Sequence, residues 1–186
     1  EDIANMGFNC VRLPIHYELF LTAEQRAVRN AVILGGGSAH DAYKDALAGW
    51  VAEGSIATTT DLDGFQYIDD LIEWCSEFGV WISLDMHAAP GSQGVTLGIT
   101  DGFYPNNLWD YPVFQDVLVE IWDAISDRYR DESRIAMYEF INEPNSVPGG
   151  GPAIHDLTQR LITMVRDKGD QHLIGVHGNG YSNVYD

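Results

Sequence analysis

The sequence predicts an α/β fold in which four parallel strands alternate with helices. Short apolar runs of strand length alternate with longer segments whose apolar residues recur at helical spacing. Strands that are joined in this order through helices lie parallel in one sheet. A chain of 186 residues with 45% hydrophobic residues is also long enough to bury a core. The candidate strands are residues 9–14, 80–87, 135–142 and 172–177.

Three crossover helices are expected between these strands. Each has apolar residues at a period of 3.6, and its ends carry helix-terminating or helix-starting residues. Gly79 and Gly169 stand where two helices should end, while Pro112 and Pro152 stand near two helix starts. The apolar positions are Phe65, Ile68, Ile72 and Cys75; Phe114, Leu118, Ile121 and Ile125; and Ile154, Leu157, Leu161 and Val165.

Residues 21–60 form an insertion after the first strand, within what we interpret as a single domain over residues 1–186. The segment is predicted to hold two short helices joined by a flexible turn at Gly35-Gly-Gly-Ser38. Because it follows the carboxyl end of a strand, it should lie over the face where a site would form. It could act as a lid or a substrate-binding wall, or it could be an insertion without a catalytic role.

Composition excludes some classes of partner. The net charge is −18, with 28 acidic residues against 10 basic ones. Such a surface repels phosphate backbones, so we expect no nucleic-acid partner, whereas a neutral polysaccharide is compatible. No apolar run approaches the roughly 18 residues of a membrane span, so we expect a soluble protein. Cys10 and Cys75 lack metal-type spacing and are expected to be buried free thiols.

Polar residues stand at the ends of three predicted strands. Arg12 lies near the end of the first strand, His87 ends the second, and Asn142-Glu143-Pro144 closes the third. The carboxyl ends of parallel strands meet at one edge, so these groups should converge there. Pro144 is expected to keep Glu143 extended, because a residue before proline avoids helical dihedral angles. Glu143 would bring to this edge a carboxyl group that can donate a proton.

These segments, Asn9-Cys-Val-Arg-Leu-Pro14, Leu84-Asp-Met-His-Ala-Ala-Pro-Gly-Ser-Gln93 and Ile135 through Pro144, resemble glycoside hydrolase family 5, the cellulase and β-glucanase family. The resemblance implies a partial (β/α)8 barrel that covers about strands two to five, and a retaining β-glucanase or β-glucosidase that needs no cofactor or metal. It implies Glu143 as general acid/base. Asn142 would bind the sugar 2-hydroxyl, and Arg12 and His87 would shape the glucose subsite.

The segment after the second predicted strand is most similar to the exo-β-1,3-glucanases of this family, although Gly94 stands where their loop usually has an asparagine. Trp109 and Tyr104 are expected to stack on sugar rings, with core packing as the alternative for both. His16 is expected to be a solvated loop residue. His177 and Tyr181 are interpreted as part of a plain turn that could otherwise line the cleft. The linkage cleaved, β-1,3 or β-1,4, stays open.

A second carboxylate is required for glycoside cleavage. Glu139 precedes Glu143 by four residues, or about 13 Å along a strand. Retaining pairs are about 5 to 5.5 Å apart and inverting pairs about 6.5 to 9.5 Å. Glu139 is therefore interpreted as a deeper barrel charge that pairs with Arg12, and Asp85 as an ion-pair partner that could orient His87. The family resemblance implies that the nucleophile lies on a later strand, so the isolated chain is expected to be inactive.

Two other functions remain open at this point. A noncatalytic half-barrel could bind sugar, or assemble with a second copy or with the missing barrel half through its open sheet edges. A metal-dependent hydrolase could be built around Asp85, His87 and His177, although this set has few ligands. The family resemblance also implies an extracellular location, while the segment from Glu1 lacks a signal-peptide pattern.

Overall fold

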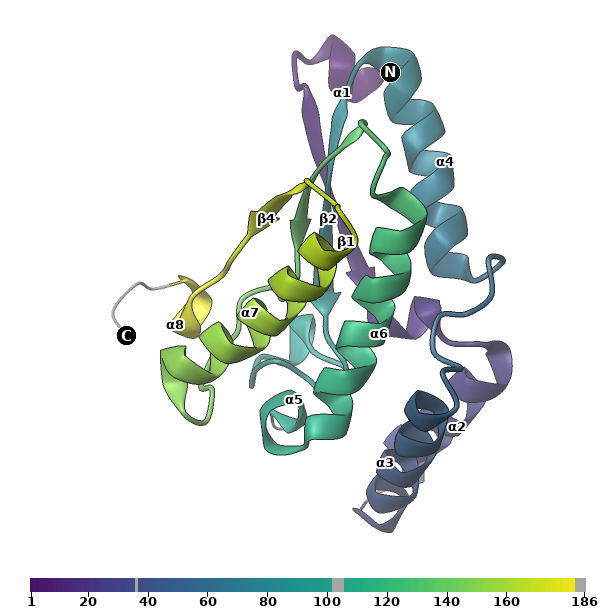
Figure 1. The fold of residues 1–186 in the computed structure, drawn as a ribbon, viewed down its shortest axis with the longest axis vertical. Coiled ribbons are helices and arrows are strands. Elements are labelled where there is room, and N and C mark those ends of the chain that lie inside the picture. The colour runs from purple at the N-terminus through teal and green to yellow at the C-terminus, as the bar shows by residue number, and fades with distance from the viewer. Residues whose placement is uncertain (36, 102–105, 183–186) are drawn as a thin grey trace.

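The computed structural model describes residues 1–35, 37–101 and 106–182. Its centre is a sheet of four parallel strands in the order β1-β2-β3-β4 (Figure 1). The strands are β1 (Cys10–His16), β2 (Trp81–Ala88), β3 (Ile135–Glu139) and β4 (Leu173–Gly175). The predicted α/β fold with a parallel sheet is therefore confirmed, and the carboxyl ends of all four strands lie at the same end of the sheet.

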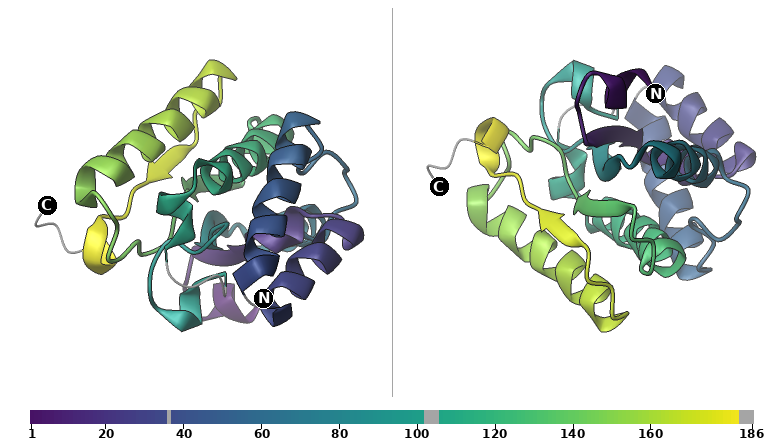
Figure 2. Two further views of the ribbon diagram at one scale, coloured as in Figure 1. Left: turned by 90° about the horizontal axis from the view of Figure 1, so that it is seen from below. Right: turned by 90° about the horizontal axis from the view of Figure 1, so that it is seen from above.

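Three long helices provide the crossovers and lie on one side of the strands (Figure 2). They are α4 (Asp63–Phe78), α6 (Pro112–Tyr129) and α7 (Gly150–Asp167). Of the twelve apolar positions predicted for them, all but the half-buried Ile72 are buried. The shorter elements are α1 (Asp2–Asn5), η1 (Tyr17–Phe20), η2 (Leu97–Ile99), α5 (Asn107–Asp110) and α8 (Asn179–Ser182). No helix in the described ranges is both long and apolar enough to cross a bilayer.

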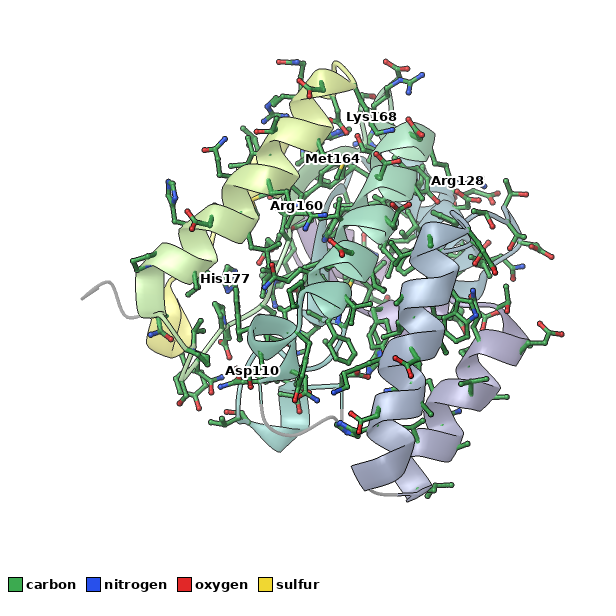
Figure 3. All side chains as sticks on the ribbon, turned by 60° about the horizontal axis from the view of Figure 1, so that its bottom comes forward. Asp110, Arg128, Arg160, Met164, Lys168 and His177 are labelled. Atoms are coloured by element: carbon green, nitrogen blue, oxygen red, sulfur yellow. The ribbon has the colours of Figure 1, made fainter. Side chains whose placement is uncertain are left out.

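The ends of the crossover helices follow the sequence signals. Gly79 ends α4 with a left-handed φ of 70°, which glycine adopts without a steric penalty, and Pro112 occupies the first turn of α6. Salt bridges then connect α6 and α7. Arg160 contacts Asp116 at 2.6 Å, and Lys168, at the end of α7, reaches Asp127 at 2.7 Å (Figure 3).

The insertion forms a hairpin of two helices, as expected, and both are longer than predicted. They are α2 (Ala23–Gly35) and α3 (Gly37–Ala52), with Gly36 of the predicted turn outside the described residues. Figure 1 shows the hairpin at the lower end of the molecule, together with α5, where the strands terminate. The insertion therefore lies at the same end of the sheet as the predicted site.

The face of the sheet opposite the crossover helices is partly open. Arg12 has a side chain that is 38% exposed on this face, and Cys10, on the same strand face, is exposed as well. The expected burial of Cys10 is therefore wrong, whereas Cys75 is buried. The physical reason is that β1 is an edge strand of the described sheet, so one side of Cys10 has no neighbouring strand.

Strand boundaries differ most in β3, which ends at Glu139 rather than at residue 142. Phe140 and Ile141 are buried, but the backbone has already left the sheet. The indole Nε1–H of Trp122 donates to the Phe140 carbonyl at 3.2 Å, and Asn142 N–H donates back to Met86 O at 3.1 Å. The segment 140–144 is thus a bend over the end of the sheet.

Candidate functional site

Arg12 is the centre of a polar network at the ends of the strands. Its Nη2 donates to Glu139 Oε2 at 2.8 Å and to Asn142 Oδ1 at 2.9 Å. Its Nη1 lies 2.9 Å from Asp85 Oδ2. The hydrogen bond to Glu139, together with the charges of Asp85 and Glu143, raises the pKa of Arg12 against the effect of burial. One guanidinium thus ties β1 to β2, to β3 and to the bend after β3.

Glu139 is a fixed anion at the base of this network. Besides Arg12, it accepts hydrogen bonds from Ser83 Oγ at 2.6 Å and His177 Nε2 at 2.9 Å. Burial acts to raise its pKa, but the hydrogen bonds from Arg12, Ser83 and His177 lower the pKa of Glu139 from 4.5 to about 2. The predicted pairing of Glu139 with Arg12 is confirmed, and both carboxylate oxygens already have donors.

This depressed pKa predicts an acid-dependent loss of stability. Because the folded-state pKa of Glu139 lies below its unfolded value, its stabilisation is present above about pH 5 and is lost as the pH falls towards 2. The shift corresponds to an upper limit of roughly 3 kcal/mol. We expect the difference in unfolding free energy between the wild type and Glu139→Gln to shrink between pH 7 and pH 3, measured by urea denaturation. The exposed Glu73→Gln serves as control, and parallel pH profiles for wild type and Glu139→Gln would contradict this assignment.

His87 is oriented by Asp85. Their side chains meet at 2.7 Å between Nδ1 and Oδ2. An ionised carboxylate only accepts hydrogen bonds, so Nδ1–H of His87 donates to Asp85. Burial raises the pKa of Asp85, while His87 and Arg12 act in the opposite direction. Asp85 thus forms the expected ion pair, with Arg12, and also contacts His87.

Asn142 presents an unused donor. The side chain is 1% exposed, and its Oδ1 accepts from Arg12. Its Nδ2 is buried and has no hydrogen-bond partner among the described residues. A buried amide nitrogen without a partner is costly, so a ligand hydroxyl at this position would gain a hydrogen bond that the protein has prepared.

Glu143 has a left-handed backbone, with φ of 41°. The expectation that Pro144 keeps it extended is therefore wrong. Tertiary contacts hold the residue instead, since its N–H donates to His177 Nδ1 at 3.0 Å and its carbonyl accepts from Asn145 Nδ2 at 3.1 Å. The Glu143 charge contributes to the raised pKa of Arg12, so the carboxylate and the guanidinium lie in the same site.

His177, interpreted from the sequence as part of a plain turn with the cleft as the alternative, contacts both Glu143 and Glu139. It follows β4 and lies beside the start of α7 (Figure 3). Since Nδ1 accepts the Glu143 N–H, Nε2 carries the proton that it donates to Glu139. Its position close behind a strand was visible in the sequence, but its two hydrogen-bond partners were not.

The remaining predicted residues have different outcomes. Trp109 is half-buried on α5, packs partly against the core, and donates from Nε1 to Gln93 O at 3.0 Å. Tyr104 lies outside the described residues. Tyr181 is 50% exposed, and its hydroxyl meets Thr96 Oγ1 at 2.6 Å. His16 is not a solvated loop residue, because it ends β1 and is partly buried; burial and the charge of Arg29 lower its pKa to about 3.

Arg29 connects the insertion to the loop that follows β2. It is 5% exposed on α2, forms a salt bridge with Asp101, and donates from Nη1 to Glu18 Oε2 at 2.6 Å. Asp101 in turn accepts the Gly91 N–H at 3.0 Å. Burial raises the pKa of Asp101 to about 7, while Arg29 acts to lower it. The insertion is therefore coupled to the loop that carries Gln93.

The described residues contain no cluster of three or more side chains arranged to hold a metal ion. Asp85, His87 and His177 were the candidate metal ligands in the sequence. Both ring nitrogens of His177 already have hydrogen-bond partners, and Asp85 Oδ2 is shared by Arg12 and His87. The geometry is that of a network of hydrogen bonds and ion pairs between polar side chains.

The chain is similar to known proteins in sequence and in fold. The family model described as Cellulase (glycosyl hydrolase family 5) matches residues 1–186. The chain is 27% identical over 184 residues to a beta-xylosidase of Phanerodontia chrysosporium, covering 97% of this chain and 31% of that protein. It is 31% identical over 171 residues to a probable glucan 1,3-beta-glucosidase A of Aspergillus fumigatus, covering 89% and 32%.

A solved glycoside hydrolase structure has the same fold over this part. It superposes with a TM-score of 0.68 and 22% identity, covering 99% of this chain and 46% of the other. The chain thus spans about a third of the length of these two curated relatives and under half of the solved chain.

Proposed function

Since this chain belongs to the cellulase family, glycosyl hydrolase family 5, we propose that it forms the acid/base side of a retaining β-glucan hydrolase site. Glu143 donates a proton to the leaving glycosidic oxygen and later takes one from the attacking water. The observation that carries this proposal is the buried, unpartnered Nδ2 of Asn142, directly before Glu143 and fixed by Arg12 through its Oδ1.

Each residue has a distinct part in this proposal. Asn142 donates to the sugar 2-hydroxyl, a bond that strengthens as the ring becomes oxocarbenium-like. Arg12 holds Asn142 and Glu139 in place, and His87, oriented by Asp85, contacts the glucose unit. This chemistry needs no cofactor, because proton transfer and carboxylate attack supply the reacting groups.

The attacking carboxylate is proposed to lie outside residues 1–186. Glu139 is unsuited to attack, because Arg12, Ser83 and His177 occupy its oxygens and its pKa is lowered to about 2. Asp85 is 0% exposed and shares one oxygen between Arg12 and His87. A retaining site needs its two carboxyl groups about 5 to 5.5 Å apart across the sugar.

The proposed substrate is a neutral β-linked glucan. The family description and the glucan 1,3-beta-glucosidase relative favour glucose units, whereas the beta-xylosidase relative makes xylosides the necessary comparison. A net charge of −18 is compatible with an uncharged polysaccharide. The comparisons do not favour the alternative of a noncatalytic sugar-binding half-barrel.

The experiment compares two polypeptides in hydrolysis assays with three substrates: laminarin, an aryl β-glucoside and an aryl β-xyloside. Residues 1–186 alone should show no appreciable turnover, whereas a polypeptide that also supplies the remaining barrel strands should hydrolyse the glucan. Appreciable turnover by the isolated chain would contradict the placement of the nucleophile. No turnover by the completed barrel would contradict the hydrolase proposal itself.

We further propose that the sheet edges at β1 and β4 are covered by the missing barrel half or by a second copy of the chain. Exposed apolar side chains lie on or beside these edge strands, with Leu173 67% and Val176 58% exposed, and unpaired strand edges favour association. Light scattering distinguishes the two, since a folded chain that stays monomeric at high concentration excludes the second copy.

A further inference from the structure

Side chains bind three backbone groups around Glu143, namely its N–H, its carbonyl oxygen and the carbonyl oxygen of Asn142. A positive φ at a residue other than glycine or asparagine costs of the order of 1–3 kcal/mol and persists only when its surroundings enforce it. Here the proline that follows restricts the residue further. The φ of 41° at Glu143 therefore requires specific contacts.

Gln93 supplies the first contact, from the loop after β2. Its side chain is fully buried, and its Nε2 lies within 3.0 Å of the carbonyl oxygens of Asn142, His87 and Ile99. Its Oε1 accepts the Ala89 N–H at 3.1 Å. One amide thus joins the end of the strand that bears His87 to the carbonyl just before Glu143.

Asn145 supplies the second contact, from the other side of the same residue. It is 2% exposed; its Nδ2 donates to Glu143 O at 3.1 Å, and its Oδ1 accepts the Val95 N–H at 2.9 Å. Gly94 makes room for it, since a Cβ at Gly94 would lie 2.3 Å from Asn145 Nδ2. Glycine at position 94 is therefore required by the close approach of this amide.

We propose that Gln93 and Asn145 are positioning residues for Glu143. They bind the carbonyl oxygens on either side of its Cα, while His177 binds its N–H, and together they hold the left-handed conformation that sets the direction of the side chain. The conformational part of this inference stands on these contacts alone. Its catalytic part rests on the proposed function of Glu143 as acid/base.

The test replaces the donating amides by carboxylates of the same size. In Gln93→Glu and Asn145→Asp, the carbonyl of Asn142 or of Glu143 loses its donor and faces an oxygen. In the isotopically labelled chain, a strong nuclear Overhauser cross-peak between the amide proton and Hα of Glu143 reports the positive φ. We expect both variants to lose this strong cross-peak.

The matched control is Gln115→Glu. Gln115 also donates from a half-buried amide to a backbone carbonyl, that of Leu108 at 3.0 Å, but outside the contacts to Glu143. It should leave the Glu143 cross-peak unchanged. If Asn145→Asp does not fold, Asn145→Ala removes the donor without adding charge and is judged by the same cross-peak. A wild-type cross-peak in both the Gln93 and the Asn145 variants overturns the inference.

A kinetic measurement then tests positioning separately from the proposed function. In a polypeptide that hydrolyses laminarin, Asn145→Ala should lower kcat by roughly 10 to 100-fold, the size expected for a misplaced catalytic group, with KM nearly unchanged. If Asn145→Ala instead lowers kcat/KM by the same factor through a higher KM, the inference that Asn145 positions Glu143 for catalysis is overturned. An unchanged rate in Glu143→Gln would instead refute the proposed function, while the cross-peak still decides the conformational inference.

Discussion

Replacing Glu143 by glutamine is expected to lower kcat/KM for laminarin by roughly 10²–10⁴-fold, the usual contribution of a general acid/base. Glutamine keeps the size of the side chain but does not transfer the proton. The measurement requires a polypeptide in which this chain is part of an active barrel. The loss should appear mainly in kcat, since the proton is transferred in the transition state.

The leaving group provides a sharper test of the role of Glu143. In an aryl β-glucoside whose phenol is acidic, the phenolate leaves without being protonated. Glu143→Gln should therefore slow cleavage of this glycosidic bond far less than cleavage of laminarin. The exposed Glu73→Gln on α4 serves as the matched control and should leave both rates unchanged. Equal losses on both substrates would show that Glu143 does not act as the acid.

Removing the buried guanidinium of Arg29 is expected to destabilise the chain by about 3–5 kcal/mol, the typical effect of leaving a buried charge without its partner. In Arg29→Met, Asp101 remains 2% exposed with no counter-charge, and Tyr17 OH loses the donor that lay 3.0 Å away. Urea denaturation monitored by circular dichroism measures the loss, with the midpoint shifted and the slope unchanged.

The same helix supplies the control for Arg29→Met. Arg26, also on α2, forms a salt bridge of 2.6 Å with Asp63, but both side chains are partly exposed. Exposed pairs contribute about 0–1 kcal/mol, so Arg26→Met should change the stability little. In the double variant Arg29→Met/Asp101→Asn, part of the lost stability should return, because the buried carboxylate that faced Arg29 is no longer present. Similar effects for Arg29 and Arg26 would refute the assignment of a buried ion pair.

The fold could be predicted because its elements carry strong periodic signals. The apolar positions of α4, α6 and α7 lie on the buried faces, and Gly79 and Pro112 mark helix ends. The end of β3 could not be predicted in this way. Phe140 and Ile141 continue the apolar run although the chain has bent away from the sheet. Both are buried, Phe140 against Trp122, and a buried position favours an apolar side chain whether or not it lies in a strand.

The site was predicted where chemistry and strand order were enough. Arg12 pairs with Glu139, and Asp85 forms an ion pair with Arg12, both in line with polar residues at parallel strand ends. The contacts that set the Glu143 backbone were missed. Two of them, through Gln93 and His177, join residues that are 49 and 34 positions apart, and a local rule such as the effect of Pro144 gives no information about them.

The contact of Arg29 with Asp101 has a consequence for exchanging parts between related proteins. Asp101 also binds the Gly91 N–H, so the helical hairpin and the loop after β2 share one buried charge pair. A chimera that receives only the hairpin, or only the loop, would bury an unmatched ion. The two segments, although Arg29 and Asp101 are 72 positions apart in the chain, must therefore be transplanted or deleted as one unit.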